Sequence, residues 1–381
     1  MKGQAMGTAT SPRMRVRYSY LPQQLQYPEE VLKAIREHLK TGIFTLGREV
    51  EQFELAFASL IGAKYAIGVG SGTDALMLSL RAIGIGQGDE VITAANTFVA
   101  TVGAIHNVGA RPVLVDVSQD FTIDPEQIAR AITPRTKAVI PVHLTGDVAD
   151  MDAILSLAER HGLAVVEDAC QAVGATSQGR SAGTMGTCGA FSLHPLKNLN
   201  VWGDAGVIVT ADPLLDHRLR LLRNHGLKNR DEVEILGYNS RLDSIQAIVG
   251  NWLMPQLQGI TAQRNANAEL YDAAFKQMPR DITLPLRRPG VRRVFHLYMF
   301  YARERDALYR YLHEQGVEAK IHYPIPLHLQ RGLAHLGYKP GDFPETERQA
   351  KSVITLPVDQ LLTEEQLAYT VETVRQFYQI R

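Results

Sequence analysis

The segment AVIPVHLTGDVADMDAILSLAERHGLAVVEDA, residues 138–169, contains one complete strand–helix–strand unit. The short runs 138–143 and 164–169 are rich in β-branched residues, which is typical of buried strands. The residues between them, from Asp150 to Gly162, have the length of a helix, and a closing glycine is a common helix stop. This order predicts two parallel strands joined by a crossover helix.

The same alternation continues on both sides of this unit. Further apolar runs predict strands at 65–70, 90–94, 112–117, 190–193 and 206–210. Helix-length segments separate several of them, and one begins with Asp124 and Pro125, a favoured pair for the N-cap and first helical position. The expected fold class is α/β, with a mostly parallel seven-stranded sheet covered by helices on both faces.

After about residue 243 the pattern becomes mostly helical. Helical stretches are expected around Pro255 and Gly259, followed by a strand and further helices at 294–302, 304–316 and 363–379. The segment IHYPIPLHLQ is interrupted by prolines and cannot continue a helix. The expected domains are a loose N-terminal arm at 1–25, a large α/β domain at 26–255 and a smaller α+β domain at 256–381.

The composition limits the possible partners and compartments. Among 381 residues, Lys plus Arg and Asp plus Glu both number 40, so no global charge favours nucleic acid or an anionic membrane. No apolar run reaches the ~18 residues of a membrane span, and the N-terminus lacks a signal-peptide core. Cys170 and Cys188 make no disulfide framework and are expected to be core thiols. We therefore expect a cytoplasmic protein without membrane or nucleic-acid partners.

Ligands of parallel sheets bind at the carboxyl ends of the strands, and two such ends carry an anion site and a carboxylate. In VGSGTDAL a strand ends at Gly70 and a helix begins near Asp74, so free N–H groups and the helix dipole favour an anion there. Asp168 lies at a buried strand tip, where a charge needs a partner. Capping of a following helix is its alternative role, and Glu167 is expected to point to the opposite face.

Two further residues complete a possible site. Lys197 lies in FSLHPLKNLNVWGDAG, residues 191–206, just after a predicted strand and close to Ser192. Taken alone it could be a loop lysine that reaches water, but in a partly desolvated site its pKa falls and it becomes a nucleophile. Phe98 follows the strand at 90–94 and could cover a planar ring. An anion site, a carboxylate, an aromatic face and a lysine are what pyridoxal 5′-phosphate requires.

The motifs SGTDAL, NTFVAT, VVEDACQAVGA, FSLHPLKNLNVWGDAGVIVT, GYNSRLDSIQA and IHYPIPLH occur in this order from about residue 25 onward. In this set the chain resembles the DegT/StrS-type sugar aminotransferases. The resemblance implies the type I fold of pyridoxal-phosphate enzymes and a homodimer with shared active sites. It also implies transfer of an amino group from glutamate or glutamine to a keto or aldehyde sugar, with pyridoxamine 5′-phosphate as the intermediate form. The implied process is amino-sugar biosynthesis for a surface polysaccharide or a secondary metabolite.

The resemblance also implies roles for individual residues. Lys197 is the lysine that bonds to the cofactor, and Asp168 is the partner of its pyridine nitrogen. The residues implied to contact the ring or phosphate are Phe98, Gln171, Gly72, Thr73 and Ser192. Asn239 is implied to reach the phosphate from the neighbouring subunit, and His322 and Tyr323 to line the sugar site.

Two alternative functions and one alternative site remain. A sugar dehydratase of the same fold would carry histidine in place of Lys197, so the lysine favours transamination. A non-catalytic regulatory relative would not need the intact set of Lys197, Asp168 and Ser192. The histidines at 322, 328 and 335 lack the short spacing of helical zinc ligands, so no metal site is expected.

Overall fold

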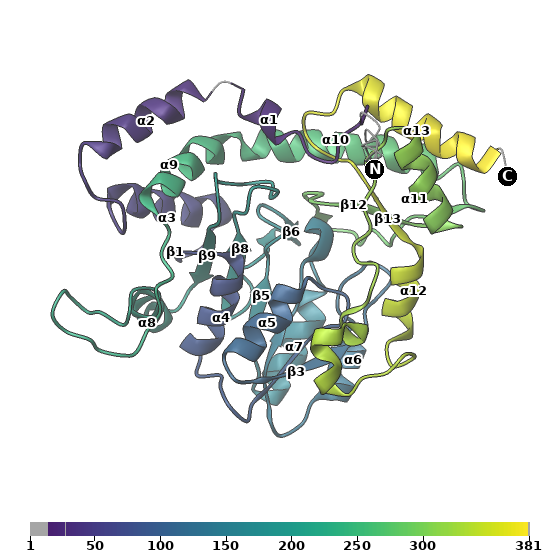
Figure 1. Cartoon of the computed structure of the whole chain (residues 1–381). Coiled ribbons are helices and arrows are strands. Elements are labelled where there is room, and N and C mark those ends of the chain that lie inside the picture. The colour runs from purple at the N-terminus through teal and green to yellow at the C-terminus, as the bar shows by residue number, and fades with distance from the viewer. Residues whose placement is uncertain (1–13, 27, 380–381) are drawn as a thin grey trace, which may run out of the picture.

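The computed structural model describes residues 14–26 and 28–379, and its centre is a seven-stranded sheet (Figure 1). The strand order is β1-β9-β8-β5-β4-β2-β3. The strands are β1 (Tyr65–Val69), β2 (Glu90–Ala94), β3 (Arg111–Val115), β4 (Thr136–Ile140), β5 (Ala164–Asp168), β8 (Cys188–Ser192) and β9 (Gly206–Thr210). Each of the seven strands predicted from the apolar runs is confirmed.

The sheet is mostly parallel, as predicted. From β3 through β2, β4, β5 and β8 every neighbouring pair is parallel. Strand β9 runs antiparallel to both of its neighbours, β8 and β1. The carboxyl ends of β1, β2, β5 and β8 therefore lie along one edge of the sheet.

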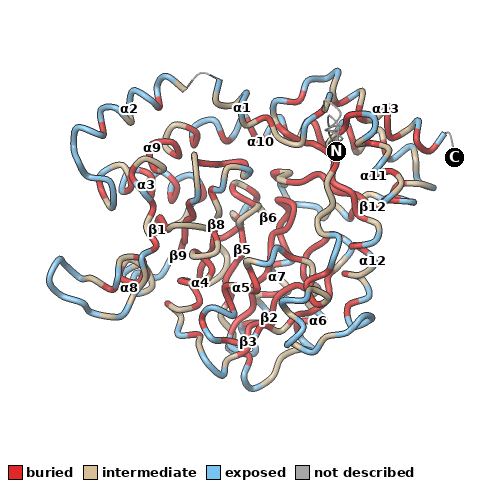
Figure 2. The backbone as a smooth tube through the Cα atoms, in the orientation of Figure 1, coloured by how far each residue is buried: buried red, intermediate tan, exposed pale blue. Residues whose placement is uncertain are grey.

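Helices cover both faces of this sheet, and its strands are mostly buried (Figure 2). Successive residues of one strand belong to the cores on opposite faces. Val165 belongs to the core on one face and Val166 to the core on the other. Both sides of the strand are thus apolar and need cover. The covering helices are α3 (Arg48–Ile61), α4 (Gly72–Ala82), α5 (Val99–Asn107), α6 (Pro125–Ala131), α7 (Met151–His161), α8 (Pro213–Arg223) and α9 (Ser244–Leu253).

The predicted ends of two of these helices are confirmed. The Asp124 side chain accepts a hydrogen bond from the Glu126 N–H at 2.8 Å, and Pro125 is the first residue of α6. Helix α7 ends at Gly162, whose φ of 62° lies in the left-handed region that favours glycine.

The C-terminal part has a small sheet and an aromatic core of its own. The sheet has three antiparallel strands in the order β10 (Ile282–Thr283), β12 (Tyr298–Ala302) and β13 (Val353–Leu356). It packs with α10 (Leu257–Phe275), α11 (Arg305–Glu314) and α13 (Glu364–Gln379) around Tyr271, Phe275, Tyr298 and Phe300. Helix α12 (Pro344–Ser352) leads into β13. The domain boundary near 255 stays a prediction.

The connection between the two parts is more continuous than the sequence pattern indicated. Helix α9 passes through a single 3₁₀ turn, Met254–Gln256, directly into α10. Gly259 lies inside α10 and does not interrupt it, because one glycine costs a helix only ~1 kcal/mol.

The expected arm at 1–25 is described only in part, since residues 1–13 lie outside the described residues. In the rest, Val16 is fully buried and forms a backbone bridge with Val317. The short helix α1 (Leu21–Gln24) and helix α2 (Glu29–Leu39) follow. Residues 14–25 thus pack against the C-terminal part. Within the described ranges, no helix is both long and apolar enough to span a membrane.

Candidate active site

A cavity of about 410 Å³ opens at the carboxyl ends of β1, β2, β5 and β8, where a ligand site is expected in a parallel sheet. Its other wall comes from the C-terminal part, including His296. The cavity brings together nine of the ten predicted site residues: Gly72, Thr73, Phe98, Asp168, Gln171, Ser192, Lys197, His322 and Tyr323.

Asp168 ends β5 and turns its carboxylate into this cavity. Its Oδ2 accepts a hydrogen bond from Thr101 Oγ1 at 2.8 Å, and its Oδ1 accepts one from the Cys170 N–H at 3.2 Å. The segment after Asp168 forms turns and no helix, so the helix-cap interpretation is wrong. Thr101, on the first turn of α5, was not predicted from the sequence.

Glu167, the residue before Asp168, points to the opposite side as strand alternation predicts. Its carboxylate accepts hydrogen bonds from the backbone N–H groups of Gly183, Met185 and Gly186 at 2.6–2.7 Å. His143 donates to it from Nε2 at 2.8 Å, because His143 Nδ1 accepts the Ala149 N–H. These bonds fix the end of β5 and hence the direction of the Asp168 side chain.

Lys197 lies in the cavity and not in a solvated loop. The loop is held by the Lys197 N–H, which donates to the His194 carbonyl at 2.8 Å, and by Asn200, which donates to the Lys197 carbonyl at 3.0 Å. Among the described residues none hydrogen-bonds or ion-pairs with the amine. Burial lowers the pKa of this amine, although the nearby Cys170 thiol and Asp168 carboxylate act in the opposite direction. The amine is therefore free to react.

The first turn of α4 forms an anion-binding surface. Ser71 caps the helix by accepting the Asp74 N–H at 3.1 Å, while the N–H groups of Gly72 and Thr73 have no partner within the helix. A Cβ atom on Gly72 would lie 2.8 Å from Ser192 Cβ and 2.9 Å from Cys170 Sγ. Only glycine fits here without displacement of that wall. Cys170 thus lines the cavity, so its prediction as a core thiol is wrong, whereas Cys188 is buried.

Aromatic rings and imidazoles form the rest of the wall. Phe98 lines the cavity and is 54% exposed, and its ring centre lies 6.2 Å from that of Tyr323. Burial, followed by the Asp168 charge, raises the pKa of Tyr323 to about 12. Burial and the charge of Lys197 lower the pKa of His322 to about 4. Both side chains are therefore neutral near pH 7.

Gln171 also lines the cavity and is fixed by a backbone contact. Its Oε1 accepts the Thr145 N–H at 2.8 Å. Tyr18, Asp204 and His296 line the cavity too, although the sequence had not indicated them. Asp204 belongs to the same motif as Lys197. Tyr18 and His296 come from segments without a recognisable motif, so only the folded chain brings these two to Lys197.

Asn239 does not line the cavity of its own chain. It lies exposed in the loop between α8 and α9, which extends away from the rest of the chain in Figure 1. Its backbone pairs with Asn224. The next residue, Ser240, supports the turn before α4 from outside the cavity, since its Oγ accepts the Gly70 N–H at 3.1 Å and donates to Asp74 at 2.8 Å.

Known proteins resemble this chain over nearly its whole length. The model of the DegT/DnrJ/EryC1/StrS aminotransferase family matches residues 26–375. The chain is 44% identical to a pleiotropic regulatory protein of Geobacillus stearothermophilus, over 93% of this chain and 95% of the relative. It is 43% identical to the UDP-N-acetyl-3-dehydro-alpha-D-glucosamine 3-aminotransferase of Acidithiobacillus ferrooxidans, over 91% and 93%.

A solved structure agrees with both the fold and the family. The DesV protein of S. venezuelae, crystallised with a ketimine intermediate, superposes with a TM-score of 0.93 at 41% identity, over 96% of this chain and 98% of DesV. This chain belongs to the DegT/DnrJ/EryC1/StrS aminotransferase family.

Proposed function

We propose that this protein transfers an amino group from glutamate or glutamine to the keto carbon of a nucleotide-linked sugar, with pyridoxal 5′-phosphate as its cofactor. The observation that carries the proposal is the Lys197 amine, which pairs with no described residue, in one cavity with the buried Asp168 carboxylate. This pair supplies a nucleophile and a fixed negative charge, which are the two groups that this cofactor chemistry needs.

The residues of the cavity fit the cofactor part by part. The N–H groups of Gly72 and Thr73, with the Ser192 hydroxyl, would hold the phosphate at the start of α4. The position of Gly72, where a Cβ would meet Ser192, leaves room for a close approach. Phe98 and Gln171 would contact the ring, and Asp168 its nitrogen. Solved relatives contain this cofactor in its pyridoxal and pyridoxamine forms.

Each residue then has a defined task. The bound cofactor supplies an aldehyde that accepts the amino group and a ring that withdraws electrons. Lys197 Nζ would hold the cofactor, and the same amine would take and return the proton at the α-carbon of the amino donor. Asp168 would stabilise a positive charge on the ring nitrogen, and Thr101 holds the Asp168 carboxylate in place. His322 and Tyr323 would line the sugar.

The nature of the acceptor is supported by the relatives. The Acidithiobacillus ferrooxidans enzyme is named for a UDP-linked sugar with a keto group at carbon 3. We infer the same class here, a 3-keto sugar on a nucleoside diphosphate, in amino-sugar biosynthesis for a polysaccharide or a secondary metabolite. The relative with a regulatory name leaves a non-catalytic role as the alternative. The complete set of Lys197, Asp168 and Ser192 favours catalysis.

We also propose that the enzyme is a cytoplasmic homodimer in which Asn239 completes the neighbour's phosphate site. The exposure of Asn239 outside its own cavity supports this arrangement. The two free cysteines are compatible with a reducing compartment. Neither nucleic acid nor a membrane is part of the proposal.

The test of the function is covalent labelling of the cofactor lysine. Borohydride reduction of the loaded enzyme, followed by peptide mapping, should label Lys197, because its amine lies in the cavity and its pKa is lowered. Lys197→Ala should remove the label, whereas the exposed Lys64→Ala should retain it. Label on a different lysine would contradict the proposal. Consumption of glutamate or glutamine during sugar turnover separates transamination from dehydration and from a regulatory role.

A further inference from the structure

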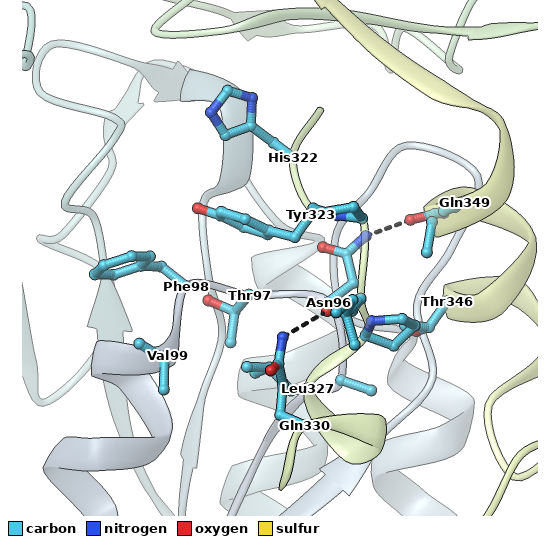
Figure 3. Close-up of a pocket in the computed structure, with 15 residues that line it drawn as sticks. Asn96, Thr97, Phe98, Val99, His322, Tyr323, Leu327, Gln330, Thr346 and Gln349 are labelled. Atoms are coloured by element: carbon cyan, nitrogen blue, oxygen red, sulfur yellow. Dashed lines mark hydrogen bonds between the residues drawn. The ribbon is translucent and has the colours of Figure 1, made fainter. Parts of the chain in front are cut away.

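A second pocket, of about 230 Å³, adjoins the active-site cavity and shares Thr97, Phe98, His322 and Tyr323 with it (Figure 3). We call it the side pocket. It lies between the loop that links β2 to α5, the segment 322–330, and helix α12. A group attached to a substrate in the main cavity can therefore extend into the side pocket.

The side pocket is apolar and uncharged. Much of its wall is aliphatic: Val99, Pro324, Ile325, Pro326, Leu327 and Ala350. None of the residues that line it is Asp, Glu, Lys or Arg, and the pKa of about 4 keeps His322 neutral at pH 7. A charged substituent would lose its hydration here without gaining a counter-ion. The pocket therefore favours a neutral group.

The hydrogen bonds around the buried Gln349 fix the orientation of the amide of Asn96, another residue that lines the side pocket. Gln349 Nε2 donates to the Ser118 carbonyl at 2.8 Å and to Glu345 Oε1 at 3.0 Å. The Gln349 oxygen must then face Asn96, and Asn96 donates to it from Nδ2. Asn96 Oδ1 is left as a buried acceptor without a partner in the described part of the chain. A buried acceptor without a donor costs free energy, so a ligand with an N–H or O–H group at this oxygen would be favoured.

We propose that the side pocket binds an acylamino substituent of the acceptor sugar, whose N–H donates to Asn96 Oδ1. The acyl carbon chain packs against Pro324, Pro326 and Leu327. This assignment rests on the proposed function and adds a specificity residue to it. Asn96 Oδ1 is covered in the free protein, so a neighbouring side chain must move before the substituent reaches it, as commonly happens on binding. A sugar acid that placed its carboxylate here would be disfavoured, because the pocket offers that charge no cation.

Two unreactive nucleotide sugars test the proposal by equilibrium binding. UDP-N-acetylglucosamine and UDP-glucose differ only at carbon 2, which carries an acetamido group in the first sugar and a hydroxyl group in the second. Their dissociation constants are measured by calorimetry on the enzyme in its pyridoxamine form. The wild-type enzyme should bind the acetamido sugar at least ~10-fold more tightly, on the scale of a buried hydrogen bond. In Asn96→Leu most of this preference should be lost, because the acceptor oxygen is gone and only the contacts of the acyl carbon chain remain.

Two controls keep the result interpretable. Gln330 also lines the side pocket, but its Nε2 already donates to the Ile325 carbonyl at 3.2 Å, so Gln330→Leu should retain the preference. Conversion of each variant to the pyridoxamine form by the amino donor shows that it is folded and loaded, and Asn96→Ala replaces the leucine variant if that one fails. A wild-type enzyme without preference, or a variant that keeps it, overturns the side-pocket assignment alone. A wild-type enzyme that binds neither sugar overturns the nucleotide-sugar acceptor as well.

Discussion

Among single residues, Asp168 has the most sharply defined environment. Its two oxygens accept from Thr101 and from the backbone of Cys170, and no cation pairs with it in the described chain. Its negative charge is thus available to a ligand in the cavity. A carboxylate that is oriented before the ligand binds stabilises positive charge on that ligand without reorganisation of the site.

Asp168→Asn should preserve the shape of the site but reduce turnover at least ~100-fold, since the amide cannot hold the ring nitrogen in its charged form. Turnover is measured as the donor half-reaction by cofactor absorbance, with the melting temperature recorded alongside. Thr101→Val, which removes only one hydrogen bond to the carboxylate, should cost ~1–3 kcal/mol of activation free energy. Nearly normal turnover in Asp168→Asn would assign this residue a structural role.

Among the elements, β5 carries structural contacts on one face and a functional side chain on the other. Successive side chains point to opposite faces, so Glu167 bonds the loop at 183–186 while Asp168 faces the cavity. The buried His143–Glu167 pair holds the strand end from behind. The same strand thus anchors itself on one side and presents its functional group on the other.

The start of α4 gives the prediction at this scale. Gly72→Ala should weaken pyridoxal phosphate binding at least ~10-fold, because the added methyl group would lie within 3 Å of Ser192 and Cys170 and displace the phosphate-binding turn. The dissociation constant is measured by titration of the cofactor-free enzyme. Gly259→Ala is the matched control, since nothing lies within 4 Å of its Cβ position and α10 continues through it. That control should leave cofactor binding unchanged and stabilise the fold by up to ~1 kcal/mol. Equal cofactor affinity in Gly72→Ala and the wild type would exclude a close phosphate contact at this turn.

At the scale of the whole molecule, the cavity depends on both parts of the chain. One wall belongs to the large sheet, and the other holds His296, His322 and Tyr323 from beyond residue 256. Asn239 lies outside this cavity, on a loop that extends from the chain (Figure 1). These positions support the proposal that two subunits share the site.

Mixed dimers test this shared site. A Lys197→Ala subunit and an Asn239→Trp subunit are each expected to be inactive alone, and their mixture should recover activity, because one of the two hybrid sites then carries neither change. The bulky tryptophan is preferred, since loss of one hydrogen bond costs only ~1–3 kcal/mol and could leave activity. Subunits are exchanged in mild denaturant, and mixed dimers are isolated by two different tags. If confirmed mixed dimers remain as inactive as both parents, the site is not shared.

The sequence by itself determined the seven strands and the position of the main site. Apolar runs and caps such as Asp124 are local signals, and parallel strands bring their carboxyl ends together, so Asp168 and Lys197 could be placed in one site from their order alone. The family motifs added the cofactor and the reaction.

Only the tertiary structure decided the directions of hydrogen bonds and the contacts between segments that lie far apart in the sequence. Thr101 reaches Asp168 because α5 begins just beyond the carboxyl end of β2, at the same sheet edge as the end of β5. Tyr18 and His296 reach the cavity from segments far apart in the chain. The free oxygen of Asn96 follows from a hydrogen-bond chain through Gln349, a residue more than 200 positions away. A sequence pattern records which residues are apolar or chargeable, but the direction of a hydrogen bond is set by the groups that packing places around it.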